Sequence, residues 1–162
     1  MRPHFVLVWV VLLVCSCSMG QEKEPAKRPI RLSLEVINKT IRPGETPKFK
    51  LTLHNEGKDP ERIIDVGSRP DLQDTYYDLQ VTQGDKVVSV VRAISDPGPI
   101  AEEDFLELKP GEKVTFQLTR FAAALESLLP SKYEARILFW QNPLLPAKTA
   151  YFSPSATFTV EK

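Results

Sequence analysis

The stretch that decides the fold is LPSKYEARILFW, residues 129–140. From Tyr133 to Phe139 apolar and polar side chains alternate, which is typical of a strand that buries one of its two faces. Ala135 and Ile137 continue the apolar face. Pro130 has a fixed φ angle and no backbone donor, so it marks the turn that leads into the strand. We therefore expect a half-buried strand that directs these four apolar side chains into the core.

The same alternation recurs on both sides of this strand, in segments separated by turns that contain proline or glycine. Segments with a clear period of two are 30–36, 49–53, 77–81, 114–118 and 156–160. Weaker candidates are 62–66 and 87–91, and the second of these follows a hairpin signal at 83–86. Residues 121–129 combine helix-forming residues without proline, so we expect one or two helical turns there. Seven or eight short strands with one short helical connection predict an all-β antiparallel sandwich over residues 30–162.

Pro130 and Tyr133 have the spacing of a tyrosine corner, a feature of Greek-key sandwiches. In that arrangement the tyrosine hydroxyl bonds to the backbone a few residues upstream. The alternative is a core tyrosine at the start of a strand. If the first interpretation holds, both residues define the fold.

Two segments carry a resemblance to a known family. Residues 108–112 read LKPGE ahead of one strand, and residues 133–135 read YEA in a later one. Together they resemble bacterial immunoglobulin-like domains, which implies a Greek-key sandwich over most of residues 30–161. A looser resemblance is to BsuPI-type proteinase inhibitors, which share this class of sandwich, although no inhibitory loop can be matched. Because the motifs are mostly turn chemistry, they imply a fold far better than a function.

The first twenty residues predict a cleavable export signal. Arg2 supplies positive charge, and Phe5–Val14 is an apolar run that is too short to span a bilayer. Residues 14–17 (VCSC) resemble a bacterial lipobox, which implies cleavage before Cys17 and diacylation of this residue. The alternative is ordinary signal-peptide cleavage after Gly20. Both routes place the mature chain outside the cytoplasm, and the first predicts a lipoprotein of the cell envelope that faces the periplasm or the exterior.

Residues 18–29 are polar and charged, and they predict a flexible tether between the signal and the sandwich. Cys15 and Cys17 are the only cysteines of the chain, and both lie in the signal region. The mature domain therefore has no disulfide and must be held together by its core.

Composition and motifs argue against an enzyme. With 21 basic and 21 acidic residues, the chain lacks the positive charge that nucleic-acid binding requires. It has no glycine-rich phosphate loop and no nucleophile motif. His54 is the only histidine of the mature chain, and the acidic groups at 65–78 and 96–104 lack the spacing of an EF-hand. We therefore expect no catalytic residue, no cofactor and no metal.

Three apolar residues are candidates for a partner contact. Trp140 ends the strand that begins at Tyr133, where it either packs in the sandwich or stacks on a sugar or peptide. Leu144 and Leu145 belong to a proline-bounded apolar loop. We expect an exported, lipid-anchored, non-enzymatic binding or structural module of a bacterial cell envelope with a protein or glycan partner. The alternatives are a secreted or periplasmic proteinase inhibitor and a carbohydrate-binding module.

Overall fold

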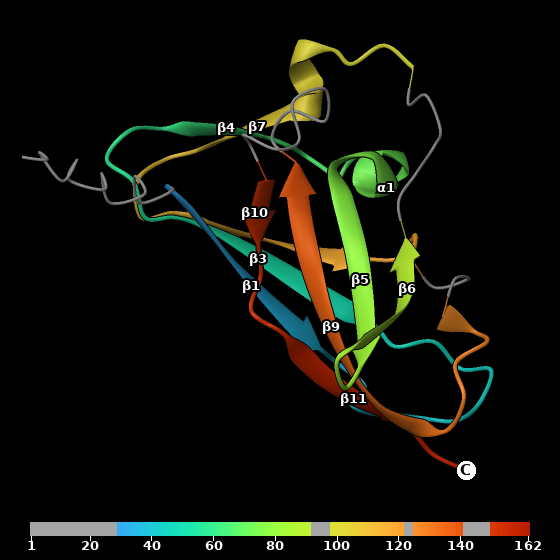
Figure 1. The fold of residues 1–162 in the computed structure, drawn as a ribbon. Helices are drawn as coiled ribbons and strands as arrows, with labels where there is room; N and C mark the ends of the chain where they lie inside the picture. Colours follow the sequence, from blue (N-terminus) through green and yellow to red (C-terminus); the bar gives the residue numbers. More distant parts are fainter. Residues whose placement is uncertain (1–28, 92–97, 122–124, 141–149) are drawn as a thin grey trace, which may run out of the picture.

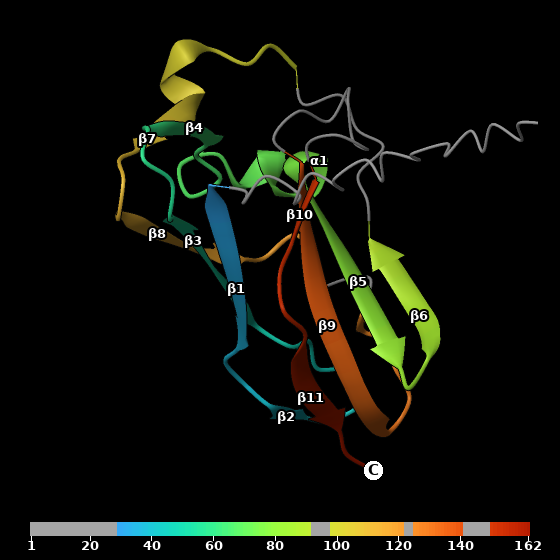
Figure 2. The ribbon, with the colours of Figure 1, turned by 60° about the vertical axis from the view of Figure 1, so that its left-hand side comes forward.

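The computed structural model describes residues 29–91, 98–121, 125–140 and 150–162. Cys17, the rest of the signal segment and nearly all of the tether lie outside the described residues, and so do Leu144 and Leu145. The described chain forms two facing sheets, which Figures 1 and 2 show as separate layers.

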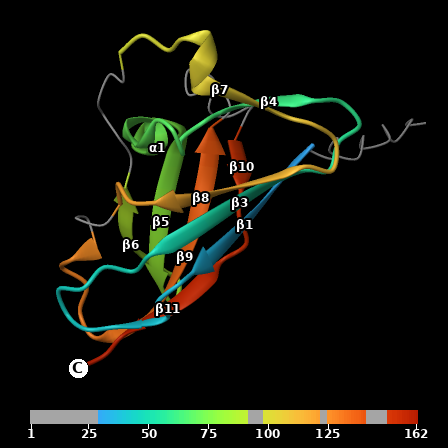
Figure 3. The same cartoon turned by 180° about the vertical axis from the view of Figure 1, so that it is seen from behind.

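The smaller sheet has three antiparallel strands in the order β1 (Ile30–Val36), β3 (Phe49–Asn55) and β8 (Lys113–Leu118). Figure 3 shows this sheet in front of the larger one. The alternation predicted from the sequence is confirmed, because Leu32, Leu51 and Phe116 are buried. The polar residues between them therefore point away from the core.

The larger sheet has the strand order β2 (Thr40–Ile41), β11 (Ala156–Val160), β9 (Ser131–Trp140), β5 (Tyr77–Gln83) and β6 (Lys86–Val91). The short β10 (Ala150–Phe152) also pairs with β9. A separate ribbon joins β4 (Glu61–Ile64) to β7 (Phe105–Leu108). Among the described strand pairs only β2 and β11 are parallel. The chain crosses from β3 to β5 and from β6 back to β8, so the predicted all-β sandwich is confirmed.

The core lies between the two sheets, and β9 is its central strand. All four side chains that the alternation assigned to the core are buried, namely Tyr133, Ala135, Ile137 and Phe139. The Phe139 ring stacks on Tyr77 of the neighbouring β5, with ring centroids 5.0 Å apart. A large apolar side chain that is fully buried contributes about 1.5–3 kcal/mol. Packing on the inner face of β9 is therefore a major source of stability.

Short helical segments cover one end of the sandwich, and the sequence pattern did not predict them. They are η1 (Pro70–Leu72), α1 (Gln73–Tyr76) and η2 (Glu102–Asp104). The buried Gln73 side chain accepts a hydrogen bond from the Thr119 backbone N–H at 2.9 Å and donates one to the Gln117 carbonyl at 2.9 Å. These long-range bonds hold α1 against the end of β8, which explains why local periodicity carried no signal for this helix.

Two other differences concern short elements. β2, β7 and β10 have two, four and three residues, too few to show a clear period, and they raise the number of described strands above the expected seven or eight. The helical turns expected at 121–129 are described only in part, and there Phe121 and Leu125 are buried. No helix of the described segments is both long enough and apolar enough to cross a bilayer.

Candidate binding surface

Tyr133 closes the turn that precedes β9. Its hydroxyl donates a hydrogen bond to the Leu129 carbonyl at 2.7 Å, across the exposed Pro130. Its ring is buried and stacks on Phe158 with centroids 5.5 Å apart. This is the geometry of a tyrosine corner. The pair of Pro130 and Tyr133 therefore sets where β9 starts and which of its residues face outward.

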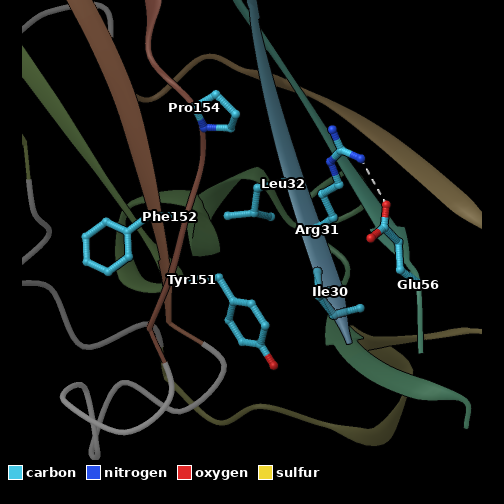
Figure 4. Close-up of a pocket in the computed structure, with 7 residues that line it drawn as sticks. All are labelled: Ile30, Arg31, Leu32, Glu56, Tyr151, Phe152 and Pro154. Carbon is cyan, nitrogen blue, oxygen red and sulfur yellow. Dashed lines mark hydrogen bonds and ion pairs between the residues drawn. The ribbon is translucent and has the colours of Figure 1, made fainter. Parts of the chain in front are cut away.

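The outer face of β9 carries Arg136, Leu138 and Trp140 in alternation with the core residues. Phe152 on β10 lies opposite Leu138 and is 53% exposed. In Figure 4 the Phe152 ring projects away from Tyr151, which points into the space between the sheets. The Arg136 guanidinium lies 5.7 Å from the centre of the Phe152 ring, at the distance of a cation–π contact.

A β-bulge brings two valines onto the same face. Val90 pairs with Gln80 and Val87 pairs with Thr82, while the register shifts by one residue between these pairs. Without the shift, Val87 and Val90 would point to opposite faces, because they are three residues apart. With it, both point outward and are 46% and 56% exposed. Val88 is the extra residue of the bulge and has no register partner on β5, and its side chain packs against the core.

These residues lie on the outer side of the larger sheet, with Gln80 and Thr82 of β5 between the valines and β9, and together they are here named the outer patch. Its members are Val87, Val90, Arg136, Leu138, Trp140 and Phe152. Trp140 lies at the C-terminal end of β9, half-buried and opposite Ala150 of β10. Arg136 is held in place by its Nε–H, which donates to the Gln80 side chain at 2.5 Å. The patch therefore combines apolar area with one positioned cation.

The sequence analysis identified Trp140 but missed Phe152 and the two valines. A signal for them was present. In the adjacent pair Tyr151-Phe152, only one of two consecutive strand residues can face the core. In the run from Val87 to Val91, not all valines can be buried in an edge strand. The missing information was which member of each set faces outward, and the bulge decides this for the valines.

Several of the described acidic residues in the two loops considered for calcium are bound by arginine or by backbone donors. Asp71 receives bidentate hydrogen bonds from Arg69 at 2.8 to 3.2 Å, and Arg69 lowers the pKa of the Asp71 carboxyl. The buried Asp104 lies 2.7 Å from the same guanidinium. Asp65 accepts from the Gly67 backbone N–H at 3.0 Å. Within the described ranges, no three acidic, histidine or cysteine side chains converge on a possible metal site.

Comparison with protein families and with curated proteins gave no match. Solved structures with a similar arrangement include the sporulation control protein Spo0M from Bacillus subtilis, at 14% identity and a TM-score of 0.49 over 83% of this chain. The alkylpurine DNA glycosylase AlkC from Pseudomonas fluorescens aligns at 15% identity and a TM-score of 0.46 over 85% of this chain. The chain spans 50% of the length of Spo0M and 32% of that of AlkC. A CARDB domain from Pyrococcus furiosus, solved with di-metal ions, aligns at 12% identity and a TM-score of 0.33, over 82% of this chain and 92% of its own.

Proposed function

We propose that this chain is an exported, lipid-anchored binding module of a bacterial cell envelope, without enzymatic activity, and that it docks a protein partner on the outer patch. The observation that carries the proposal is the exposure of Phe152, Val90 and Val87 on the sheet face that also carries the half-buried Trp140. Several exposed large apolar side chains on one face of a small domain mark a candidate contact surface.

The side chains of the outer patch favour a protein over a glycan. Aromatic residues and arginine are enriched at the centres of protein interfaces, where they become hot spots. Two of the most exposed members, Val87 and Val90, are aliphatic and offer no hydrogen bond to a sugar hydroxyl. The side-chain amide oxygen of Gln80 is already engaged by Arg136. A partner with apolar side chains and one acidic group for Arg136 would complement this surface.

Export and anchoring are supported by the sequence of residues 1–29. The VCSC segment at 14–17 offers Cys17 for diacylation, and two acyl chains give stable membrane attachment. The twelve residues from Ser18 to Pro29 would reach about 40 Å when extended. The outer patch faces away from the smaller sheet. A tether of that length would allow the patch to reach partners beyond the membrane surface.

Incorporation of a labelled fatty acid tests the anchor. We expect the wild-type chain and the Cys15→Ala variant to take up label, and the Cys17→Ala variant to lose it. The mass of the mature N-terminal peptide then identifies the modified residue. Label that survives Cys17→Ala, or a mature chain that begins at Gln21, would contradict lipid attachment at Cys17.

Site-specific photo-crosslinking in intact cells tests the patch. A photoreactive amino acid in place of Phe152 should give a discrete protein adduct. The same probe in place of Glu35, which is exposed on the smaller sheet, should not give that adduct. The adduct from position 152 should weaken when Val90 is changed to serine. A carbohydrate adduct, or adducts that are identical from both positions, would overturn the proposal.

A further inference from the structure

The outer face of the smaller sheet carries three basic side chains in one row. Arg31 of β1 is in register with His54 of β3, and His54 is in register with Lys113 of β8. We name these residues the cation row. Neighbouring strands lie about 4.8 Å apart, so the row sets three nitrogen-bearing side chains side by side across the sheet. The chain is neutral as a whole, and this alignment is a local feature of the register.

A second row lies one step along the same face and carries only hydroxyl groups. Ser33, Thr52 and Thr115 are in register, and the Thr52 and Thr115 hydroxyls are 3.0 Å apart. A hydroxyl donates as well as accepts, so this row can complete the hydrogen bonds of an anion held by the cation row. The two rows together resemble the mixture of cations and neutral donors that binds oxyanions in proteins.

The face is hollowed where the two rows meet. A depression of about 270 Å³ is lined by Arg31, Ser33, Thr52, His54 and Lys113. Within the described residues the Lys113 ammonium forms no hydrogen bond or ion pair, so its charge is available to a ligand.

One acidic residue borders the depression and limits its positive charge. A carboxylate oxygen of Glu56 lies 3.1 Å from the Arg31 guanidinium and 3.4 Å from Nδ1 of His54. The backbone of Glu56 is fixed, because its N–H donates to the Pro29 carbonyl at 2.7 Å. Glu56 therefore orients two members of the cation row and competes with any anion for them.

We propose that this depression binds the phosphate group of a phosphate ester. A phosphate monoester presents three terminal oxygens, which matches two flanking cations and a row of hydroxyl donors better than the two oxygens of a carboxylate do. The site is independent of the outer patch, because it lies on the other sheet and uses none of the same residues. The ester could be a soluble monoester or the monoester headgroup of phosphatidic acid, since both present the same three terminal oxygens.

Titration of the isotope-labelled protein with inorganic phosphate, followed by NMR, tests the site. We expect saturable shifts of the backbone amides of Arg31, Thr52 and Lys113, and no matching shifts with acetate at equal ionic strength. Glycerol 3-phosphate and vesicles that contain phosphatidic acid, which are both phosphate monoesters, then separate a soluble ester from a lipid. Stronger binding to one of them identifies the source. Equal shifts with acetate, or no saturable shift with phosphate, would overturn the proposal.

Substitutions sharpen the test, because different variants are expected to change the affinity for phosphate in opposite directions. Lys113→Gln and Arg31→Gln should each weaken phosphate binding about three- to tenfold, as expected for the loss of one charge-assisted contact near the surface. Glu56→Gln should tighten binding several-fold, because it removes the competing carboxylate. The matched control is Lys50→Gln on the same face of β3, where Lys50 pairs with Glu35, and it should leave binding unchanged. If Glu56→Gln weakens binding, or if Lys50→Gln matches Lys113→Gln, the assignment of the site is wrong.

Discussion

Arg69 and Asp104 form an ion pair of 2.7 Å between two loops that are 35 residues apart in sequence. The Asp104 side chain is only 6% exposed and also accepts a hydrogen bond from the Ala101 backbone N–H at 2.9 Å. Arg69 in turn binds Asp71 in its own loop. The ion pair between Arg69 and Asp104 therefore holds η2 against the segment that leads into η1 and α1.

Asp104→Ala should destabilise the fold by about 1–3 kcal/mol, because it removes a buried acceptor and leaves the Ala101 N–H without its partner. The unfolding free energy from urea titration at neutral pH measures this loss. Glu103→Ala, an exposed neighbour in η2, serves as the control and should have little effect. Equal stabilities of the two variants would show that the ion pair does not hold the loops.

Asp71 should make stability depend on pH in the acid range. Arg69 lowers the pKa of its carboxyl below the ordinary value of about 3.9, so the folded state binds this proton less readily than the unfolded chain. The resulting stabilisation is complete above that ordinary value and is lost as the pH falls through the lowered one. Urea midpoints measured from neutral to acid pH should therefore fall less steeply for Asp71→Asn than for the wild type. An unchanged slope would contradict the effect of Arg69.

Two buried tyrosines should respond in opposite ways to loss of the hydroxyl. Tyr133→Phe removes the hydrogen bond to the Leu129 carbonyl and should cost about 0.5–1.5 kcal/mol. The Tyr77 hydroxyl is buried and has no hydrogen-bond partner among the described residues. Tyr77→Phe should therefore leave the unfolding free energy unchanged or raise it. Thermal and urea unfolding of both variants check the difference, and a larger loss for Tyr77→Phe would refute it.

Asn55 should be among the polar residues most sensitive to substitution. Its buried side-chain amide donates to the carbonyls of Asp59 and Leu108, both at 2.8 Å, and its oxygen accepts from the Gly57 N–H at 2.8 Å. Asn55→Asp keeps the shape but sets a carboxylate oxygen against two carbonyl oxygens. We expect a loss of at least about 2–3 kcal/mol at neutral pH.

Acid should restore part of that stability, because the introduced carboxyl group, once protonated, could again donate one hydrogen bond. Unfolding curves of the Asn55→Asp variant at neutral pH and near pH 4 measure the recovery. Asn38→Asp, on the exposed turn after β1, is the control with a smaller expected loss. A variant as stable as wild type at neutral pH would contradict the role assigned to Asn55.

The strands could be predicted from the sequence wherever buried and exposed residues alternate regularly along one strand. The alternation from Tyr133 to Phe139 was sufficient, because the burial of each residue follows from its neighbours two positions away. The position of α1 was out of reach, because Gln73 is fixed by backbone groups more than forty residues later in the chain. The outer patch was predicted only at Trp140. Exposure of Phe152 and Val90 depends on sheet edges and on register, which no local pattern carries.

The β-bulge at Val88 has a consequence for solubility. β6 is the last strand in the order of the larger sheet, and its sequence, KVVSVV, has the high β-propensity and low charge typical of segments that assemble into amyloid. A regular edge strand of this composition would offer a continuous template to other copies of the chain. The bulge interrupts the regular spacing of its backbone hydrogen-bonding groups and increases its local twist. The same irregularity that displays Val87 and Val90 therefore also hinders fibril growth from this edge.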